Sequence, residues 1–242
     1  MSGVRLVRPC GLACLYALGE RTERRLTVIP PVDAECRRHL SRMGFFKAFQ
    51  TPGLIAPEPA RGSNIVIERL DSKPGDFADR AIGVLTSQMN LSAGVAPTLA
   101  THLDEIVLNA LTHARSPIGC IVCGQGFPKR GVVELAIVDL GQSIPIHLKK
   151  NPAVPRQGTD ARAIEYATVE GVTGTVGANV WGEPNSGVGL SELRAYCDSG
   201  RAEMAILSGY GMVAFAAGSS PISRRFHSRF RGCLVNVRFF TA

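Results

Sequence analysis

The stretch LDEIVLNALTHA, residues 103–114, carries the strongest signal for the fold. Glu105, Asn109 and His113 are spaced four apart, so on a helix they lie along one face. Apolar residues between them supply a second face for burial. An Asn amide oxygen can ligate Mg²⁺, and a carboxylate one turn away can orient or deprotonate a nucleophile. Taken alone, however, the stretch is better explained as an ordinary polar helix face in solvent.

A second pattern is VVELAIVDLGQSIP, residues 132–145, where an apolar strand ends in Asp139 and Gly141 follows. A carboxylate at a strand end can accept a hydrogen bond from an exocyclic amine such as that of adenine. A glycine close behind it lets the backbone approach a ligand. The alternative is a strand that ends in an ordinary turn.

The third pattern is NSGVGLSELRAYC, residues 185–197, in which Gly187 and Gly189 directly precede a predicted helix. Free backbone N–H groups at a helix start form a phosphate-binding site. The pattern lacks the third glycine of a dinucleotide-binding motif and the GK[ST] of a P-loop. By itself it is therefore weak evidence.

The order of the three patterns is more specific than any one of them. An E-x-x-x-N helix precedes a strand ending in D-x-G, then come a long loop and a G-x-G-L that opens a helix. This order resembles the GHKL superfamily, which includes gyrase, a heat-shock chaperone, histidine kinases and the MutL family. The helix looks most like that of the anti-sigma-factor serine kinases. The resemblance covers roughly residues 64–240 and implies an α/β fold, a two-layer sandwich of the GHKL (Bergerat) type. Its sheet is expected to be mixed and mainly antiparallel, with helices on one face.

By this resemblance the chain binds ATP and Mg²⁺. Glu105 is then the general base, Asn109 the Mg²⁺ ligand and Asp139 the contact to adenine. The other cofactor-binding positions shape the adenine pocket or hold the phosphates beneath a mobile lid: Gly141, Ser186, Gly187, Gly189 and Leu190. The sequence departs from the family pattern at Ser143, where the family has a second glycine. A serine there is expected to stiffen the lid hinge, so the resemblance favours nucleotide binding and leaves turnover open.

The best domain boundary is the stretch 51–63, which is rich in Pro, Gly and small residues. Residues 1–50 look like a shortened STAS-type domain, with a helix capped by Asp33. This segment is too small for a core of its own, so it should pack on the larger domain or on a partner. Residues 64–242 are expected to form the ATP-binding domain. The elements expected before the boundary are a helix at 11–18, a strand at 26–30 and a helix at 33–46.

Hydrophobic periodicity predicts the elements of the larger part. Helices come in pairs between strands, which is not the regular alternation of parallel α/β folds. The expected helices span 75–89, 97–114, 161–170 and 190–197. The expected strands span 64–70, 118–124, 132–138, 202–207, 212–216 and 234–240, with a turn at 208–211 between the fourth and fifth.

Composition limits the class of protein. With 242 residues, 45% apolar and 19% charged, the chain suits a soluble globular protein. No apolar run approaches the roughly 20 residues that span a bilayer, and the N-terminal run has no clear cleavage pattern, so neither a membrane partner nor export is expected. Seven cysteines argue against a complete disulfide framework and favour the cytoplasm. Cys120 and Cys123 form a CxxC pair, but on a strand they point to opposite faces, so a metal site there is not expected.

The formal net charge of +7 is uneven along the chain. Residues 221–242 hold five arginines and no acid, which is one pattern of nucleic-acid binding. The run SRRFHSRFRG contains no known motif for reading nucleic acid. A solvated surface is therefore the favoured interpretation, and nucleic acid ranks last among the expected partners.

Three functions are weighed. The first is an ATP-dependent protein serine kinase, in which Glu105 activates a hydroxyl of a STAS-like or sigma-factor-like regulatory partner. The second is an ATP-gated interaction switch, in which binding orders the lid with little or no turnover. The third is a nucleic-acid-associated ATPase switch that uses the basic termini. A homodimer is compatible with each. A strict histidine kinase is not expected, because no helix pair with a phospho-acceptor histidine precedes the domain.

Overall fold

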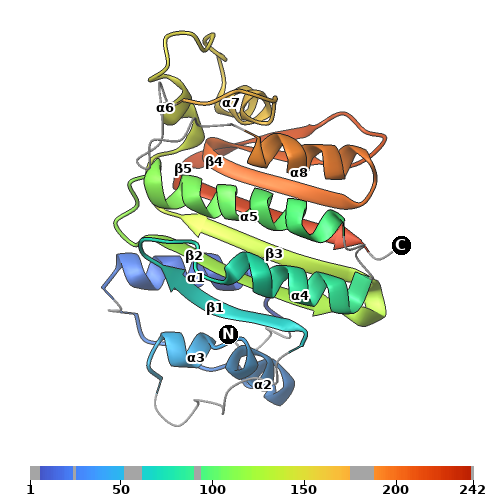
Figure 1. The fold of residues 1–242 in the computed structure, drawn as a ribbon. Coiled ribbons are helices and arrows are strands. Elements are labelled where there is room, and N and C mark those ends of the chain that lie inside the picture. The colour runs from blue at the N-terminus through green and yellow to red at the C-terminus, as the bar shows by residue number, and fades with distance from the viewer. Residues whose placement is uncertain (1–5, 24–25, 52–61, 90–93, 175–187, 241–242) are drawn as a thin grey trace.

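Five antiparallel strands form the centre of the molecule (Figure 1). The computed structural model describes residues 6–23, 26–51, 62–89, 94–174 and 188–240. The elements, in chain order, are α1 (Pro9–Arg21), α2 (Ala34–Arg42), α3 (Phe45–Ala48), β1 (Asn64–Leu70), α4 (Phe77–Met89), α5 (Val95–Thr112), β2 (Cys120–Phe127), the 3-10 turn η1 (Pro128–Arg130), β3 (Val132–Asp139), α6 (Ile144–Leu148), α7 (Asp160–Ala167), α8 (Gly189–Asp198), β4 (Ala202–Phe215) and β5 (Ile222–Phe240).

The strand order is β1-β2-β3-β5-β4, and every neighbouring pair is antiparallel. The expectation of an α/β fold with a mainly antiparallel sheet is confirmed, whereas its mixed character is not found among the described strands. The register sets Asp139, the last residue of β3, between Cys120 on β2 and Cys233 on β5. This row forms one end of the sheet, where the site described below lies.

Helices α4, α5 and α8 cover one face of the sheet (Figure 1). Their apolar sides pack on alternate strand residues, such as Val122 of β2 and Leu135 and Ile137 of β3. The amphipathic period of these helices was visible in the sequence, and their positions agree with it to within a few residues. This face is the larger of the two apolar cores.

The opposite face of the sheet is covered by α1. The expectation that helices lie on one face only is therefore wrong. Helix α1 packs on β2 and β3, and α2 and α3 extend this layer, which we call the N-terminal layer. Cys123 and Val138 face this layer, whereas Cys120 faces the other core. The prediction that the two cysteines of the CxxC pair point to opposite faces is therefore confirmed.

An ion pair fixes the N-terminal layer to the sheet. Arg8, just before α1, binds the carboxylate of Glu134 on β3 through both Nε and a terminal guanidinium nitrogen. The Glu134 side chain is 1% exposed and that of Arg8 is 39% exposed. Because a buried carboxylate without a partner is costly, this pair couples the sheet to the residues that precede α1.

Two expectations for the N-terminal segment need correction. Residues 26–30 form no strand, although their composition is typical of one. The helix expected at 33–46 is broken at Gly44, whose φ of +75° is left-handed, so α2 and α3 are separate. The predicted cap is confirmed, since the side chain of Asp33 accepts a hydrogen bond from the backbone N of Cys36 at 2.7 Å. Of the predicted boundary at 51–63, residues 52–61 lie outside the described residues.

The C-terminal hairpin also differs from the prediction. The turn expected at 208–211 lies inside the continuous strand β4, as a break in its register with β5. The chain nevertheless reverses there: a Cβ on Gly200, before β4, would lie 3.7 Å from the Cβ of Ala217, after it. A straight strand of this length would separate its ends by about 45 Å. The returning half packs along α8, where Arg194 lies 4.5 Å over the ring of Phe215. Strand β5 accordingly begins earlier than the expected 234–240.

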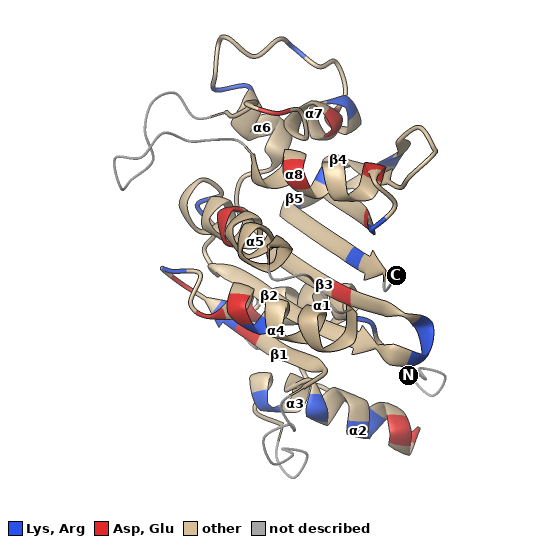
Figure 2. Cartoon of the chain, turned by 45° about the vertical axis from the view of Figure 1, so that its right-hand side comes forward, with Lys and Arg blue, Asp and Glu red and all other residues tan. Residues whose placement is uncertain are grey.

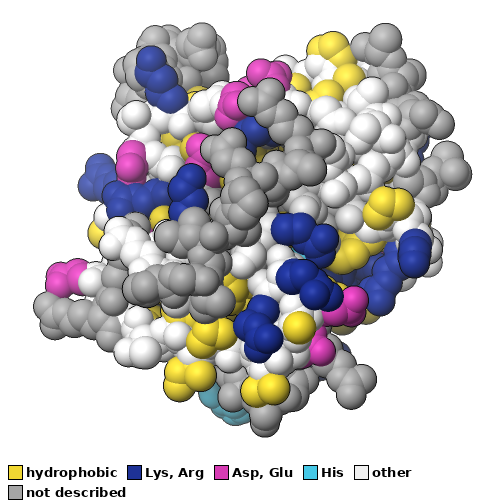
Figure 3. All heavy atoms as spheres, turned by 90° about the horizontal axis from the view of Figure 1, so that it is seen from below, with side chains coloured by type: hydrophobic (Ala, Val, Ile, Leu, Met, Phe, Trp, Pro, Cys, Tyr) yellow, Lys and Arg dark blue, Asp and Glu magenta, His cyan; other side chains and the backbone are white. Residues whose placement is uncertain are grey.

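Among the described residues, no helix combines the length and the apolar character that crossing a membrane requires. Lys and Arg residues lie on α2 and α3 at the bottom of the molecule, with an acidic residue also on α2 (Figure 2). Seen from below, several Lys and Arg side chains gather on this underside between apolar ones (Figure 3).

Candidate functional site

One cavity gathers most of the residues that the sequence singled out. Its volume is about 380 Å³, and it is bounded by α5, the end of β3, the middle of β5, α6 and the first turn of α8. Its lining includes five of the predicted site residues: Glu105, Asn109, Asp139, Gly189 and Leu190. A cavity of this size falls in the range of ligand pockets.

The other three predicted positions have different outcomes. Ser186 and Gly187 lie outside the described residues, as do positions 175–185 of the predicted lid. Gly141 lies in the loop directly after β3 and supports the cavity from behind without lining it.

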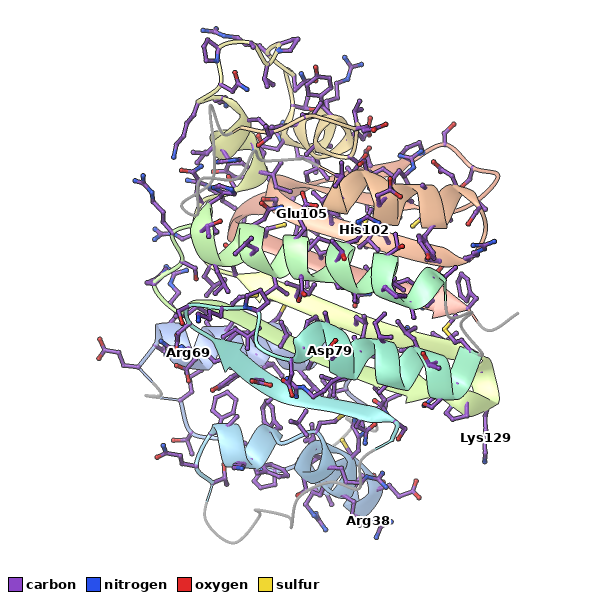
Figure 4. All side chains as sticks on the ribbon, viewed as in Figure 1. Arg38, Arg69, Asp79, His102, Glu105 and Lys129 are labelled. Carbon is purple, nitrogen blue, oxygen red and sulfur yellow. The ribbon has the colours of Figure 1, made fainter. Side chains whose placement is uncertain are left out.

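Helix α5 directs its polar residues into the cavity because its apolar side is fixed in the core. Leu103, Ile106 and Val107 are buried against the sheet and its neighbours. Glu105 and Asn109 are half-buried and line the cavity one turn apart. Figure 4 shows Glu105 on the side of α5 that faces α8. The polar face expected from the sequence thus borders a cavity rather than open solvent.

The carboxylate of Glu105 caps helix α8. Its Oε1 accepts a hydrogen bond from the backbone N of Val188, the N-cap residue of α8, at 3.1 Å. Gly189 lies close to the same side chain, since a Cβ at this position would be 3.2–3.3 Å from the Glu105 carbons. Negative charge is favoured at a helix N-terminus, and the same N–H groups suit a phosphate. The protein's own carboxylate therefore occupies an anion-binding position in this structure.

Asp139 is the most perturbed acid of the site. Its side chain is almost fully buried, and Oδ1 accepts a hydrogen bond from the backbone N of Gly141 at 2.8 Å. Burial raises the pKa of the Asp139 carboxyl to about 7, and the hydrogen bonds from the backbone of Gly141 and Cys233 oppose this shift. A carboxyl with a pKa this far above its ordinary value, facing a cavity, is typical of a functional position.

Two glycines permit the close packing around Asp139. A Cβ on Gly141 would overlap the carbonyl of Ala114, just after α5. A Cβ on Gly232, whose φ is +82°, would overlap the backbone carbonyl and Oδ1 of Asp139. Sequence reasoning identified the first glycine but missed the second, because Gly232 approaches Asp139 only through the pairing of β3 with β5.

Ser143, where the sequence departs from the pattern expected from the resemblance, adopts an ordinary extended conformation with φ of −71° and ψ of 153°. Any residue can adopt this backbone, so the position does not require glycine here. The neighbouring strand is tied to α6 by Ser208, whose Oγ donates to the carbonyl of Gly232 at 2.6 Å and accepts from the N of Ile144 at 2.9 Å. The start of α6 is thus anchored, through Ser208, to the middle of β5.

Three further residues line the cavity and were not assigned a role from the sequence. The rings of His113 and His147 stack with centroids 5.3 Å apart and planes at 27°. Burial, together with the nearby His113 and Lys150, lowers the pKa of His147 to about 4, so His147 is neutral at pH 7. The side-chain Nε2 of Gln142 is buried and has no hydrogen-bond partner within the described part of the chain. A signal for Gln142 was present, since it directly follows the D-x-G motif.

The oxygen donors of the cavity fit Mg²⁺ only together with a ligand. Asn109 and Glu105 offer hard oxygen atoms on one side of the cavity, and Mg²⁺ takes its other ligands from water and phosphate. No group of three or more His, Cys, Asp and Glu that could hold a metal occurs in the described ranges. Mg²⁺ binding at this site would therefore depend on bound phosphate groups.

Comparison with models of known protein families and with curated proteins gave no match.

Proposed function

We propose that this protein binds Mg-ATP in a GHKL-type two-layer sandwich and acts as a regulatory protein serine kinase or ATPase on a protein partner. One observation carries the proposal: Glu105 and Asn109 of α5 line the same cavity as Asp139 of β3, and the first turn of α8 closes it. The N-terminal layer is an addition to the sandwich on the face away from the cavity.

The residues divide the work of binding along the cavity. Asp139, buried at its base, accepts a hydrogen bond from the exocyclic amine of adenine, and the Gly141 backbone holds its carboxylate in place. The N–H groups at the start of α8 bind phosphate oxygens. Asn109 would hold Mg²⁺, which offsets negative charge on the phosphates when bound.

Glu105 is the residue placed for the chemical step. In the proposed kinase it accepts the proton of a serine hydroxyl of the partner as that oxygen attacks the terminal phosphorus of ATP, while the bond from this phosphorus to the β,γ-bridging oxygen breaks and ADP leaves. For this, its carboxylate must leave the N–H of Val188, which it binds in this structure. That contact favours a second candidate function, an ATP-gated interaction switch with little turnover.

The first experiment is calorimetric titration of the purified chain with Mg-ATP. Asp139→Ala should weaken binding at least about tenfold, because it removes the only direct contact to the base in this proposal. Asn109→Ala should reduce the dependence of affinity on Mg²⁺. Asp79→Asn, an exposed carboxylate on α4 outside the cavity lining, is the matched control and should bind like the unaltered chain.

Absence of ATP binding by the folded, unaltered chain would overturn the proposal. If ATP binds, labelled γ-phosphate separates the two functions. Transfer to serine of a partner protein, lost in Glu105→Gln, supports the kinase. Tight binding with no release or transfer supports the switch.

A further inference from the structure

The outer part of β5 projects a basic, aromatic surface that the proposed ATP site does not use. Every residue from 222 to 229 is exposed, as is Arg231. Four arginines stand in this stretch, and no Asp or Glu follows Glu203 in the sequence. Phe226 is 40% exposed, and Tyr210, on the paired strand, is 42% exposed. We call residues 224–231 the arginine segment.

The arginine segment contains a break in the strand pairing. Gly209 pairs with Phe230 and Gly211 pairs with Arg225, so one residue of β4 stands opposite the four residues 226–229 of β5. That single residue is Tyr210, whose backbone N donates a hydrogen bond to Oδ2 of Asp160 in α7 at 2.8 Å. Because β5 has the longer path at this bend, residues 226–229 lie on its outer side, outside the ladder. Irregularities of this kind are often functional features.

The base of the segment is held rigidly beside the candidate ATP site. Gly232 approaches Asp139 so closely that a Cβ would overlap it, and its carbonyl accepts from Ser208 at 2.6 Å. Half-buried Phe230 packs into the N-terminal layer. The segment is therefore a fixed protrusion rather than a loosely attached loop.

The chemistry of this surface fits one class of partner. Arginine binds phosphate through paired N–H groups and also stacks on flat rings. Aromatic side chains that alternate with arginines form stacking platforms for unpaired bases. An acidic peptide would be served by the charges alone and would leave Phe226 and Tyr210 without a role.

We propose that the arginine segment binds single-stranded nucleic acid, with Arg224, Arg225 and Arg229 on the phosphates and Phe226 stacked on a base. From the sequence alone a solvated surface was the better interpretation. The structure adds the exposure of every residue from 222 to 229, the break in the ladder, and an exposed Phe226 that directly follows Arg224 and Arg225 on the strand. The inference is independent of ATP binding.

The test is fluorescence anisotropy of a labelled twenty-nucleotide oligo(dT) and oligo(U) with the full chain, without nucleotide, over a range of salt concentrations. The logarithm of the association constant should fall linearly with the logarithm of salt, by about 0.7 per phosphate contact. The triple variant Arg224→Gln, Arg225→Gln, Arg229→Gln should bind at least tenfold more weakly and lower the slope by about 2. Phe226→Ala should weaken binding at least about fivefold and leave the slope unchanged.

The matched control is Arg38→Gln with Arg42→Gln, two exposed arginines on α2, and it should change neither affinity nor slope beyond a small general charge effect. Circular dichroism melts establish that all variants are folded. No binding at low salt, or equal losses in the control and the triple variant, would overturn the proposal. So would tighter binding of polyglutamate than of oligonucleotide with no effect of Phe226→Ala, which would identify an acidic protein as the partner.

Discussion

Replacing Asp139 by Asn should make the protein's stability less sensitive to pH. Burial raises the pKa of this carboxyl in the folded chain to about 7, whereas its ordinary value, expected in the unfolded chain, is 3.8. Between these values the folded state holds a proton that the unfolded state has lost. The stabilisation is therefore complete below about pH 4 and disappears as the pH rises through about 7.

The magnitude follows from the pKa difference. Each pH unit between the two pKa values costs about 1.4 kcal/mol, so raising the pH from 5 to 8 crosses about two such units and lowers the free energy of unfolding by about 3 kcal/mol. The amide that replaces the carboxyl in Asp139→Asn has no proton to lose, so this contribution vanishes in the variant. The amide also makes weaker hydrogen bonds than the carboxylate. This loss is the same at both pH values, so it drops out when each protein is compared with itself.

Urea unfolding curves at pH 5 and pH 8, for both proteins, measure this difference. We expect the unaltered chain to lose about 3 kcal/mol more than Asp139→Asn over this range. Parallel pH dependences of the two proteins would refute the reasoning and show that the carboxyl titrates at its ordinary value. Asp79→Asn is the control, because that carboxylate is exposed.

Three other predictions concern packing and the start of α8. Gly141→Ala should destabilise the fold by at least about 2 kcal/mol, because the added Cβ would overlap backbone atoms. Gly83→Ala, in open space on α4, should instead stabilise the fold by about 0.5–1 kcal/mol. Thermal melts compare the two variants, and similar melting temperatures would contradict the close approach at Gly141. Arg8→Ala should lower the free energy of unfolding in urea by about 3 kcal/mol, because it leaves the buried Glu134 carboxylate without its ion pair. The double variant Arg8→Met with Glu134→Gln should lower it clearly less. The reverse order would show that other groups compensate the charge of the buried carboxylate. Glu105→Ala should bind ATP about fivefold more tightly than Glu105→Gln, which keeps an acceptor for the first turn of α8; equal affinities in calorimetry would show that carboxylate and phosphate do not compete there.

The sequence predicted those parts of the fold whose pattern is local. Strand β1 and helix α4 follow from clear periodicities of two and 3.6 residues, and their limits agree closely with expectation. The positions of Glu105 and Asn109 on one helix face follow from their spacing. Their meeting with Asp139 in one cavity followed only from the family resemblance, because it depends on how the helix docks on the sheet.

The second covered face of the sheet was missed although a signal was present. All eight residues of β3 are buried, and its sequence, VVELAIVD, is nearly continuous in apolar residues rather than alternating. Such a run indicates burial on both faces. The prediction of a strand at 26–30 was wrong for a different reason. Strand-forming residues adopt a strand only when a neighbouring strand pairs with them, and the edge strand β1 pairs only with β2 among the described strands.

Cavity residues contributed by tertiary contact were also out of reach of the sequence. His147 lies on the short helix α6 and reaches His113 only because α6 folds against the end of α5. Gly232 matters only through its strand neighbour. Neither residue belongs to a spacing pattern that could have drawn attention to it.

The shared strand β3 makes the sheet a thin partition between two compartments. Val138 faces the N-terminal layer and Asp139 faces the cavity, so a single peptide bond separates the two environments. A partner that displaced α1 would remove the support behind Val138 and shift the adjacent carboxyl without entering the cavity. A solvatochromic label on α1 would therefore test whether a ligand in the cavity alters the packing behind Val138.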